Sequence, residues 1–243
     1  MSEPDETGDL SVIIPAFNEA GRLGHTLDTL VNYLSARRAA AEIVVVDDGS
    51  TDDTVGLARG RLAGAGMEHR ILTGRPNRGK GYSVREGAVA ARHSWTLITD
   101  ADLSTPVAEV EKLFAAAAET GADIVAGSRG LPASTIGIPQ GWLRRNMGRS
   151  FNHIVRGLTG LRLKDTQCGF KLWRTAPLRP VLARLTIDGF AWDVELLMTA
   201  RRAGLTITEV PVEWNNAGGS KVAIVKDSLH MLYDLLRLRL RGP

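Results

Sequence analysis

The stretch Trp95-Thr96-Leu97-Ile98-Thr99-Asp100-Ala101-Asp102 is an apolar run of strand type that ends in two carboxylates, one residue apart. Residues at alternate positions of a strand point the same way, so Asp100 and Asp102 can converge on one divalent cation or on one sugar. Two like charges at a strand end repel each other unless a cation lies between them. The stretch therefore predicts a buried strand with a metal or sugar site at its carboxyl end.

A second acidic cluster repeats this pattern earlier in the chain. Residues 42–52 read Glu-Ile-Val-Val-Val-Asp-Asp-Gly-Ser-Thr-Asp, so that Asp47 and Asp48 follow a β-branched run. Parallel sheets covered on both faces contain such runs, and ligands bind beyond the carboxyl ends of their strands. Both clusters are therefore expected on one rim. The same residue types also favour turns and helix N-caps, so the segment could end a strand and begin a helix without binding any ligand.

Strand-like and helical patterns alternate along the first half of the chain. Apolar residues from Val107 to Ala117, for example, are spaced for one face of a helix. Such alternation favours right-handed crossovers between parallel strands. We therefore expect an α/β fold with a doubly wound, mostly parallel central sheet and helices on both faces. The expected strands are Leu10–Ile14, Ile43–Val46, Arg70–Leu72, Trp95–Thr99 and Asp123–Ala126.

The second half of the chain has a different pattern. Asp193–Arg202 predicts a helix, and Leu205–Trp214 predicts an edge strand or a hairpin broken by Pro211. Ahead of them lie a Gly- and Pro-rich stretch, Arg-rich helical sequence and a short segment, at 130–141, 142–160 and 165–173.

The last part of the chain, residues 221–243, is predicted to be an amphipathic basic helix. Apolar residues recur there at helical spacing, and Arg237, Arg239 and Arg241 follow. Such a helix can pack on the sheet or lie on a membrane, and its basic end suits an anionic surface.

The composition is ordinary for one soluble globular unit, with 44% hydrophobic and 23% charged residues and a net charge of +3. Residues 1–9 are acidic and lack apolar periodicity, which predicts a disordered tail ahead of one domain over 10–220. The single cysteine, Cys168, excludes an internal disulfide and is compatible with a reducing compartment. No apolar run is long enough to cross a bilayer, so we expect a cytoplasmic protein with peripheral membrane contact and no nucleic-acid partner.

One motif favours a different class of protein. Gly74-Arg75-Pro76-Asn77-Arg78-Gly79-Lys80-Gly81 follows a strand and approaches the phosphate-binding loop of nucleoside triphosphatases, but Gly81 replaces the hydroxyl that would bind magnesium. A nucleoside triphosphatase is therefore an alternative. A dinucleotide-binding fold is disfavoured, because Pro15-Ala16-Phe17-Asn18-Glu19 follows the first strand where a glycine fingerprint is required.

Taken in order, four motifs resemble the inverting family-2 glycosyltransferases of GT-A fold. They are Val12–Glu19, Val45–Asp52, Asn77–Gly81 and Asp100–Asp102. Four further segments are similar to the dolichyl- or polyprenyl-phosphate glucosyltransferase branch of that family. They are Asp102–Pro106, Gly127–Arg129, Asp165–Lys171 and Asp193–Leu197.

The resemblance implies a nucleotide-sugar site in residues 10–129. Asp102 would hold Mg²⁺ or Mn²⁺, and Lys80, a catalytic candidate like Asp102, would contact the diphosphate. Asp47 or Asp48 would meet the uracil edge. The other nucleotide-sugar contacts implied are Pro15, Ala16, Phe17 and Glu19 at the base and ribose, and Asp100 with Ala101 at the ribose or sugar.

The resemblance also implies an acceptor half, residues 130–220. A phosphomonoester acceptor is mostly ionised near neutral pH, because its second pKa is about 6, and it needs positioning and charge shielding more than a strong base. Asp193 is either a catalytic carboxylate or a helix-start carboxylate favoured by the helix dipole. The candidate acceptor-phosphate ligands are Arg129, Arg145, Lys171 and Lys221.

We therefore expect metal-dependent, inverting transfer of glucose from UDP-glucose to a polyprenyl phosphate of dolichyl type at the cytoplasmic membrane face. GDP-mannose or a UDP-N-acetylhexosamine are alternative donors, and a non-catalytic nucleotide-sugar-binding module is an alternative from another class. Eukaryotic members of the branch carry a membrane anchor ahead of the catalytic domain, whereas this sequence does not, so its attachment is expected to be peripheral.

Overall fold

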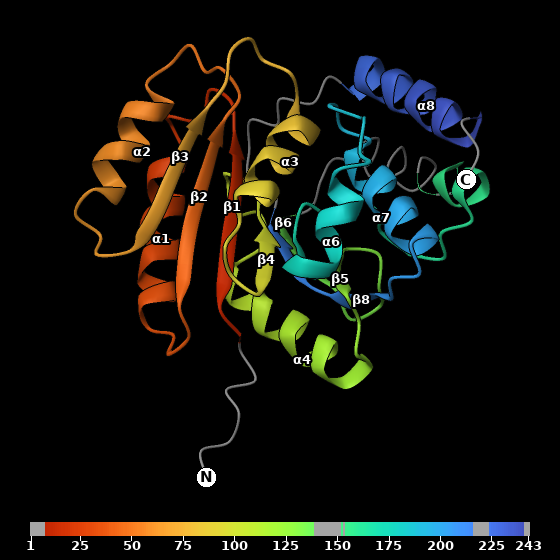
Figure 1. The fold of residues 1–243 in the computed structure, drawn as a ribbon, viewed down its shortest axis with the longest axis horizontal. Helices are drawn as coiled ribbons and strands as arrows, with labels where there is room; N and C mark the ends of the chain where they lie inside the picture. The colour runs from red at the N-terminus through yellow and green to blue at the C-terminus, as the bar shows by residue number, and fades with distance from the viewer. Residues whose placement is uncertain (1–7, 139–151, 153, 216–223, 241–243) are drawn as a thin grey trace.

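The computed structural model describes residues 8–138, 152, 154–215 and 224–240. Most of the predicted N-terminal tail lies outside these residues, as do Arg145 and Lys221. The expected α/β architecture is confirmed, with a mostly parallel central sheet and helices on both of its faces (Figure 1).

The central sheet has seven strands in the order β3-β2-β1-β4-β7-β5-β8. All neighbours run parallel except β7, which is antiparallel to both β4 and β5. The strands are β1 (Leu10–Ala16), β2 (Ala41–Asp47), β3 (Glu68–Thr73), β4 (Trp95–Ile98), β5 (Ile124–Ser128), β7 (Lys171–Arg174) and β8 (Ile207–Pro211).

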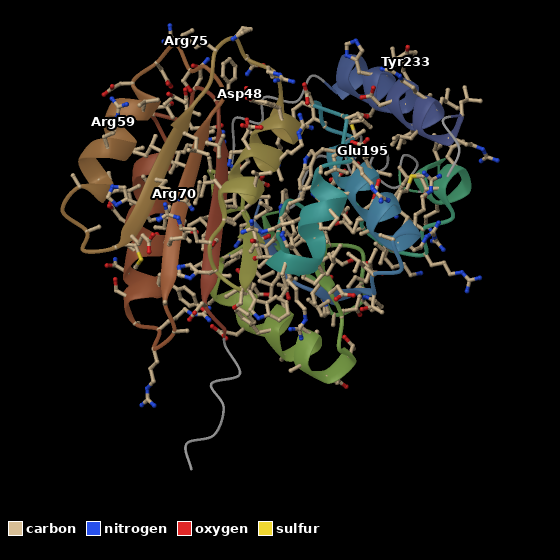
Figure 2. The ribbon with its side chains drawn as sticks, in the orientation of Figure 1. Asp48, Arg59, Arg70, Arg75, Glu195 and Tyr233 are labelled. Carbon is tan, nitrogen blue, oxygen red and sulfur yellow. The ribbon has the colours of Figure 1, made fainter. Side chains whose placement is uncertain are left out.

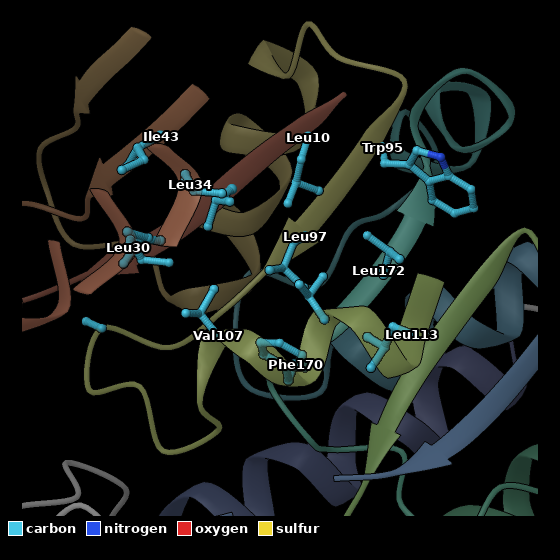
Figure 3. Packing of buried hydrophobic residues seen from close by; sticks show 14 of the residues in the cluster. Leu10, Leu30, Leu34, Ile43, Trp95, Leu97, Val107, Leu113, Phe170 and Leu172 are labelled. Atoms are coloured by element: carbon cyan, nitrogen blue, oxygen red, sulfur yellow. The ribbon is translucent and has the colours of Figure 1, made fainter. Parts of the chain in front are cut away.

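Helices bury both faces of this sheet, as the continuous apolar runs require. In β1, Val12 and Ile14 belong to one core cluster, while Ile13 points into the other. Figure 3 shows part of the first cluster, which includes Leu30, Leu97 and Leu113. Its helices are α1 (Leu23–Ser35), α2 (Thr54–Leu62) and α4 (Val110–Thr120), the last preceded by a 3₁₀ turn, η1 (Val107–Glu109).

The opposite face carries the helices of the second cluster. The helix expected at Asp193–Arg202 is confirmed as α7 (Trp192–Arg202). The helix expected in residues 221–243 is confirmed over its described part as α8 (Ile224–Leu240). α8 packs against α7 rather than against the sheet. None of the helices in the described part of the chain has the length and apolar content that a bilayer crossing requires. The other helices of the second cluster are α3 (Lys80–Ala90) and α6 (Thr175–Leu182).

Two parts of the sequence prediction need correction. The short segment at 165–173 leads into β7, a central strand that the pattern did not predict. The hairpin alternative for Leu205–Trp214 is wrong, because β8 is a parallel edge strand and β9 (Glu213–Asn215) leaves the sheet. β9 pairs in parallel with β6 (Thr135–Ile138), which lies in the Gly- and Pro-rich stretch.

Gly87 lets α3 approach the sheet closely. A Cβ built on Gly87 would overlap Ile13 and would lie 3.0 Å from Cγ2 of Val46. We expect Gly87→Ala to lower the free energy of unfolding by about 1–3 kcal/mol, because the core has no room for the methyl group. Urea unfolding followed by circular dichroism measures this change.

Gly60→Ala is the matched control, since Gly60 also lies inside a helix but has no heavy atom within 4 Å of its built Cβ. It should raise the free energy of unfolding by about 0.5–1 kcal/mol through helix propensity alone. Equal effects of the two substitutions would contradict the packing explanation.

Candidate active site

The ends of β1 and β2 are held together by Asn18. Its backbone has φ of 54°, and its side-chain Oδ1 accepts hydrogen bonds from the N–H groups of Thr51 at 2.7 Å and Asp52 at 3.3 Å. Asn18 N–H in turn donates to Ser50 Oγ at 2.8 Å. The two predicted nucleotide-binding segments, 15–19 and 47–52, therefore form one continuous rim beyond the carboxyl ends of these strands.

Asp47 and Asp48 both take part in the local structure of this rim. The Asp47 carboxylate accepts from the N–H groups of Gly49 and Ser50, each at 3.2 Å to Oδ2, which is the turn chemistry that the sequence left open. Asp48 is buried and accepts from the N–H of Gly79 at 2.7 Å and from that of Arg78. Burial raises the pKa of Asp48 despite these two donors. Asp48 thus fixes the loop that precedes α3.

The amide groups of this loop are already used by the protein. Asp188 presents its carbonyl oxygen to the N–H groups of Gly81 at 2.8 Å and Tyr82 at 3.2 Å. A Cβ at Gly81 would lie 2.5 Å from the carbonyl oxygen of Ile187, so the glycine serves a close approach of two backbones. With the amides of 78 and 79 donated to Asp48, four neighbouring amide groups of this loop are unavailable to a triphosphate, which disfavours the triphosphatase alternative.

Lys80 and Asp100 form an ion pair at the end of β4. The Lys80 ammonium donates to Asp100 Oδ1. Burial alone would raise the pKa of Asp100, but Lys80, with Arg129 and Lys171 further away, holds that pKa below its usual value. Gly169 leaves room for the carboxylate, because a Cβ there would overlap it. Lys80 and Asp100, the residues predicted to contact the diphosphate and the ribose or sugar, therefore lie side by side.

Asp102 lies at the same rim and is fixed by Ser104. Its Oδ1 accepts from Ser104 N–H at 3.0 Å and from Ser104 Oγ at 2.9 Å, while Oδ2 lies 3.5 Å from a guanidinium nitrogen of Arg22. Arg22 is held by Glu19, with a shortest N···O distance of 2.7 Å. The Asp102 side chain is 20% exposed, so a ligand can reach it.

A divalent cation fits this rim only if a bound substrate and water supply most of the oxygens that coordinate it. The described residues contain no group of three or more Asp, Glu, His or Cys side chains that could hold a metal ion alone. Mg²⁺ is commonly bound through one or two carboxylates, with substrate phosphates and water as the other ligands. Asp102 can supply one such oxygen, whereas Asp100 is committed to Lys80.

Arg129 and Asp165 make a bidentate ion pair beyond the end of β5. Arg129 Nε lies 2.6 Å from Asp165 Oδ2 and its NH2 lies 3.0 Å from Oδ1, which leaves NH1 outside the pair. The guanidinium carbon also lies 5.7 Å from the ring centroid of Trp214. Burial would raise the pKa of Asp165, but Arg129 lowers it to about 2. The pair is therefore charged at neutral and at mildly acidic pH.

Lys171 and Asp193 lie beneath this rim, in the interior. Lys171 has no exposed surface, donates to the carbonyl oxygen of Cys168, and has its ammonium nitrogen 3.8 Å from Asp193 Oδ2. Burial raises the pKa of Asp193 to about 6, against the attraction of Lys171 and Lys80. Lys171 therefore has no surface through which to contact an acceptor phosphate, and its positive charge lies buried below the site.

The remaining predicted contacts vary in position. Pro15 and Ala16 end β1 in register with Val46 and Asp47. The carbonyl of Ala101 accepts from Thr26 at 2.7 Å, which fixes the turn between Asp100 and Asp102 without exposing its side chain.

Three residues of the site were not predicted from the sequence: Arg22, Asp165 and Asp188. The i, i+3 spacing of Glu19 and Arg22 is a signal that could have found the first. Asp165 was noted only within a family segment. Asp188 carries no local signal, because its partners Arg78 and Arg85 are more than 100 residues away in the chain.

Comparison with known proteins identifies the family to which this fold and rim belong. Residues 11–182 match the family described as Glycosyl transferase family 2. The match covers more than half of the chain, so the chain belongs to this family and is a glycosyltransferase by class.

Individual relatives are similar along almost the whole chain. Dolichyl-phosphate beta-glucosyltransferase of Saccharomyces cerevisiae is 34% identical over 98% of this chain and 76% of its own length. The Homo sapiens protein of the same name is 34% identical over 97% of this chain and 76% of its own length. The expected family and branch are thereby confirmed as what this chain resembles.

Among solved structures, glucosyl-3-phosphoglycerate synthase from Mycobacterium tuberculosis has a similar fold. A complex with phosphoglyceric acid superimposes with a TM-score of 0.68 at 20% identity, over 97% of this chain and 81% of that one. A complex of the same enzyme with Mn²⁺, UDP and glucosyl-3-phosphoglycerate gives a TM-score of 0.67. At this identity the likeness shows the GT-A fold alone.

Asp188 should control the loop that carries Lys80. Its carboxylate lies 2.8 Å from Arg78 and 2.6 Å from Arg85. We expect Asp188→Ala to lower the free energy of unfolding by about 1–2 kcal/mol, because two charge-assisted hydrogen bonds are lost. The amides of residues 78–82 should then exchange faster with deuterium, as measured by mass spectrometry.

The control for this experiment is Asp28→Ala, which removes an exposed 2.6 Å ion pair with Arg61. Such surface pairs contribute about 0–1 kcal/mol, and exchange at 78–82 should not change. Unaltered exchange in Asp188→Ala would show that the loop does not depend on Asp188.

Asp193 should give the protein a pH-dependent stability. The folded protein binds this proton more tightly than the unfolded chain, since the pKa rises from 3.8 to about 6. The resulting stabilisation is complete below about pH 4 and is lost as the pH rises to about 6. Two pKa units correspond to about 3 kcal/mol. Between about pH 4 and pH 6 the wild type should therefore lose stabilisation of that order, whereas Asp193→Asn, which has no carboxyl to titrate here, should not. Urea unfolding from acidic to neutral pH measures the difference, and parallel curves for the two proteins would contradict it.

Proposed function

We propose that this protein transfers glucose, with inversion, from UDP-glucose to a polyprenyl phosphate of dolichyl type, at the cytoplasmic face of a membrane and with Mg²⁺ or Mn²⁺. The observation that carries the proposal is the grouping of Lys80, Asp100 and Asp102 at the carboxyl ends of the strands. The names of relatives at 34% identity support both the glucosyl group and the lipid phosphate acceptor.

The nucleotide would bind along the rim of residues 10–129. Pro15, Ala16, Phe17 and Glu19 would border the base and ribose, and Asp47 or Asp48 would face the uracil. The solved complexes of the mycobacterial synthase with Mn²⁺ and UDP or UDP-glucose support this choice of donor. Residues 130–220 would bind the acceptor.

Asp102 would hold the divalent cation together with the donor diphosphate. The metal, when bound, neutralises negative charge that builds up on the departing nucleotide. The chain's own contribution is the Lys80 ammonium, which is fixed by Asp100 and can offer a second positive charge to the same diphosphate. Arg22, 3.5 Å from Asp102, stands at the same edge.

The acceptor phosphate would be drawn to Arg129. Its guanidinium is held rigidly by Asp165 through Nε and NH2, so NH1 can bind an anion without losing the pair. The acceptor is already ionised and needs no strong base. Asp193 would then act as a positioning residue, which balances the buried Lys171 below the site.

The reaction itself is the first test. The protein is incubated with UDP-glucose, a short-chain polyprenyl phosphate and MnCl₂, and lipid-linked glucose is separated by extraction. We expect a β-linked product, no product after chelation with EDTA, and at least about a hundredfold lower kcat in Asp102→Asn, which loses its charge at the leaving group.

Asp28→Asn is the control for this substitution, since Asp28 is an exposed carboxylate on α1 that pairs with Arg61, away from the rim. It should leave turnover unchanged. Preference for GDP-mannose or a UDP-N-acetylhexosamine would overturn the proposed donor. Binding of UDP without turnover of any donor would make the protein a non-catalytic module.

A further inference from the structure

α8 carries two apolar stripes on different sides. Met231, Leu235 and Leu238 are buried against the second core cluster. The other stripe faces solvent, although its spacing of four, three and four residues is that of one helix face. It consists of Leu229 (63% exposed), Tyr233 (63%), Leu236 (44%) and Leu240 (86%), which we call the outer stripe.

The outer stripe is held in place by the body of the protein. Arg239 donates to the carbonyl oxygens of Gly157 and Leu158, each at 3.3 Å, and so fastens the end of α8 to the helical residues 154–159. Ile154, at the start of those residues, is 43% exposed. The exposed apolar side chains therefore belong to a fixed surface and not to a frayed end.

This surface lies at the same end of the molecule as the candidate active site. In Figure 1, α8 lies toward the end where β1 and β2 finish, and Figure 2 places Tyr233 and Asp48 at that end. α8 also adjoins residues 186–189, because Asp188 and Asp234 both line one cavity of about 140 Å³. A flat partner on the outer stripe would therefore adjoin the rim.

The charges around the stripe suit an anionic partner. Arg237 and Arg239 are exposed and alternate with the leucines at the end of α8, and Arg241 continues this pattern in the sequence. Helices with one apolar face flanked by arginines lie in the interface of bilayers that contain anionic lipids.

A second copy of the chain is a poorer occupant. A stable protein interface buries about 800 Å² per partner and involves some 20–30 residues on each side. The outer stripe offers four apolar side chains on one helix. That is little for a dimer but is typical of a shallow membrane contact.

We propose that the outer stripe of α8 binds the surface of an anionic lipid bilayer and holds the active-site rim against it. The inference rests on the proposed function, because an acceptor phosphate carried on a lipid is available only at that surface. It identifies the partner as the bilayer itself and the contact as the side chains of Leu229, Tyr233, Leu236 and Leu240.

Vesicle flotation tests the proposal with the full chain. We expect wild type to float with vesicles of phosphatidylcholine and phosphatidylglycerol, more weakly with phosphatidylcholine alone, and at least tenfold less after all four stripe residues are changed to Ser. Leu229→Ser should lower binding measurably. Val89→Ser is its matched control, because Val89 is 61% exposed on α3, and it should bind like wild type.

Two further measurements separate the outcomes. Turnover of a water-soluble short-chain acceptor without vesicles should be the same in wild type and the fourfold variant, so failure of the proposed reaction is recognised independently of lipid binding. Equal flotation of the two proteins, or no flotation of wild type, would overturn the proposal. So would a wild-type dimer in sedimentation that becomes monomeric in the variant, since the stripe would then bind a second copy.

Discussion

The antiparallel strand β7, with Lys171 at its first position, determines how the site is built. Lys171 is in register with Ile98, the last residue of β4, and with Ala126 in the middle of β5, so it lies beside the carboxyl end of β4. A fully buried cation must be paired or its desolvation is uncompensated. The carbonyl of Cys168 and the carboxylate of Asp193 supply this pairing and bring 165–170 and the start of α7 to the rim.

Most charges above this buried lysine are likewise paired within the protein. Lys80 is bound to Asp100, and Arg129 to Asp165. Pairing keeps each head group in one place before a ligand arrives, which lowers the ordering cost of binding. Asp102 differs, because its carboxylate is fixed by Ser104 yet remains partly exposed. It is therefore the rim carboxylate best placed to exchange its contacts for those of a cation.

The sequence predicted the first five strands. Four of them, β1, β2, β4 and β5, are apolar runs buried on both faces, whereas β3 is a half-buried edge strand found from its short run at 70–72. The sequence could not predict β7, since four residues that include a lysine do not resemble a central strand, and Asp193 stabilises that lysine from another element. Motifs located Lys80, Asp100 and Asp102, but not their pairings. Asp188 was missed because its partner Arg78 comes near it only in the folded chain. Gly79 and Gly81, which suggested a phosphate-binding loop, instead allow the backbone of residues 187–189 to come close.

The balance of charge explains why Asp193 belongs in this cluster. The other cations, Lys80 and Arg129, have carboxylate partners of their own. Lys171 has no exposed surface, and Asp193 Oδ2 lies 3.8 Å from its ammonium nitrogen. Burial raises the pKa of Asp193 to about 6, so its carboxyl is still mostly ionised at neutral pH and compensates the buried lysine. Because Lys171 balances this negative charge beneath the rim, the pair adds little net repulsion toward an anionic ligand above it.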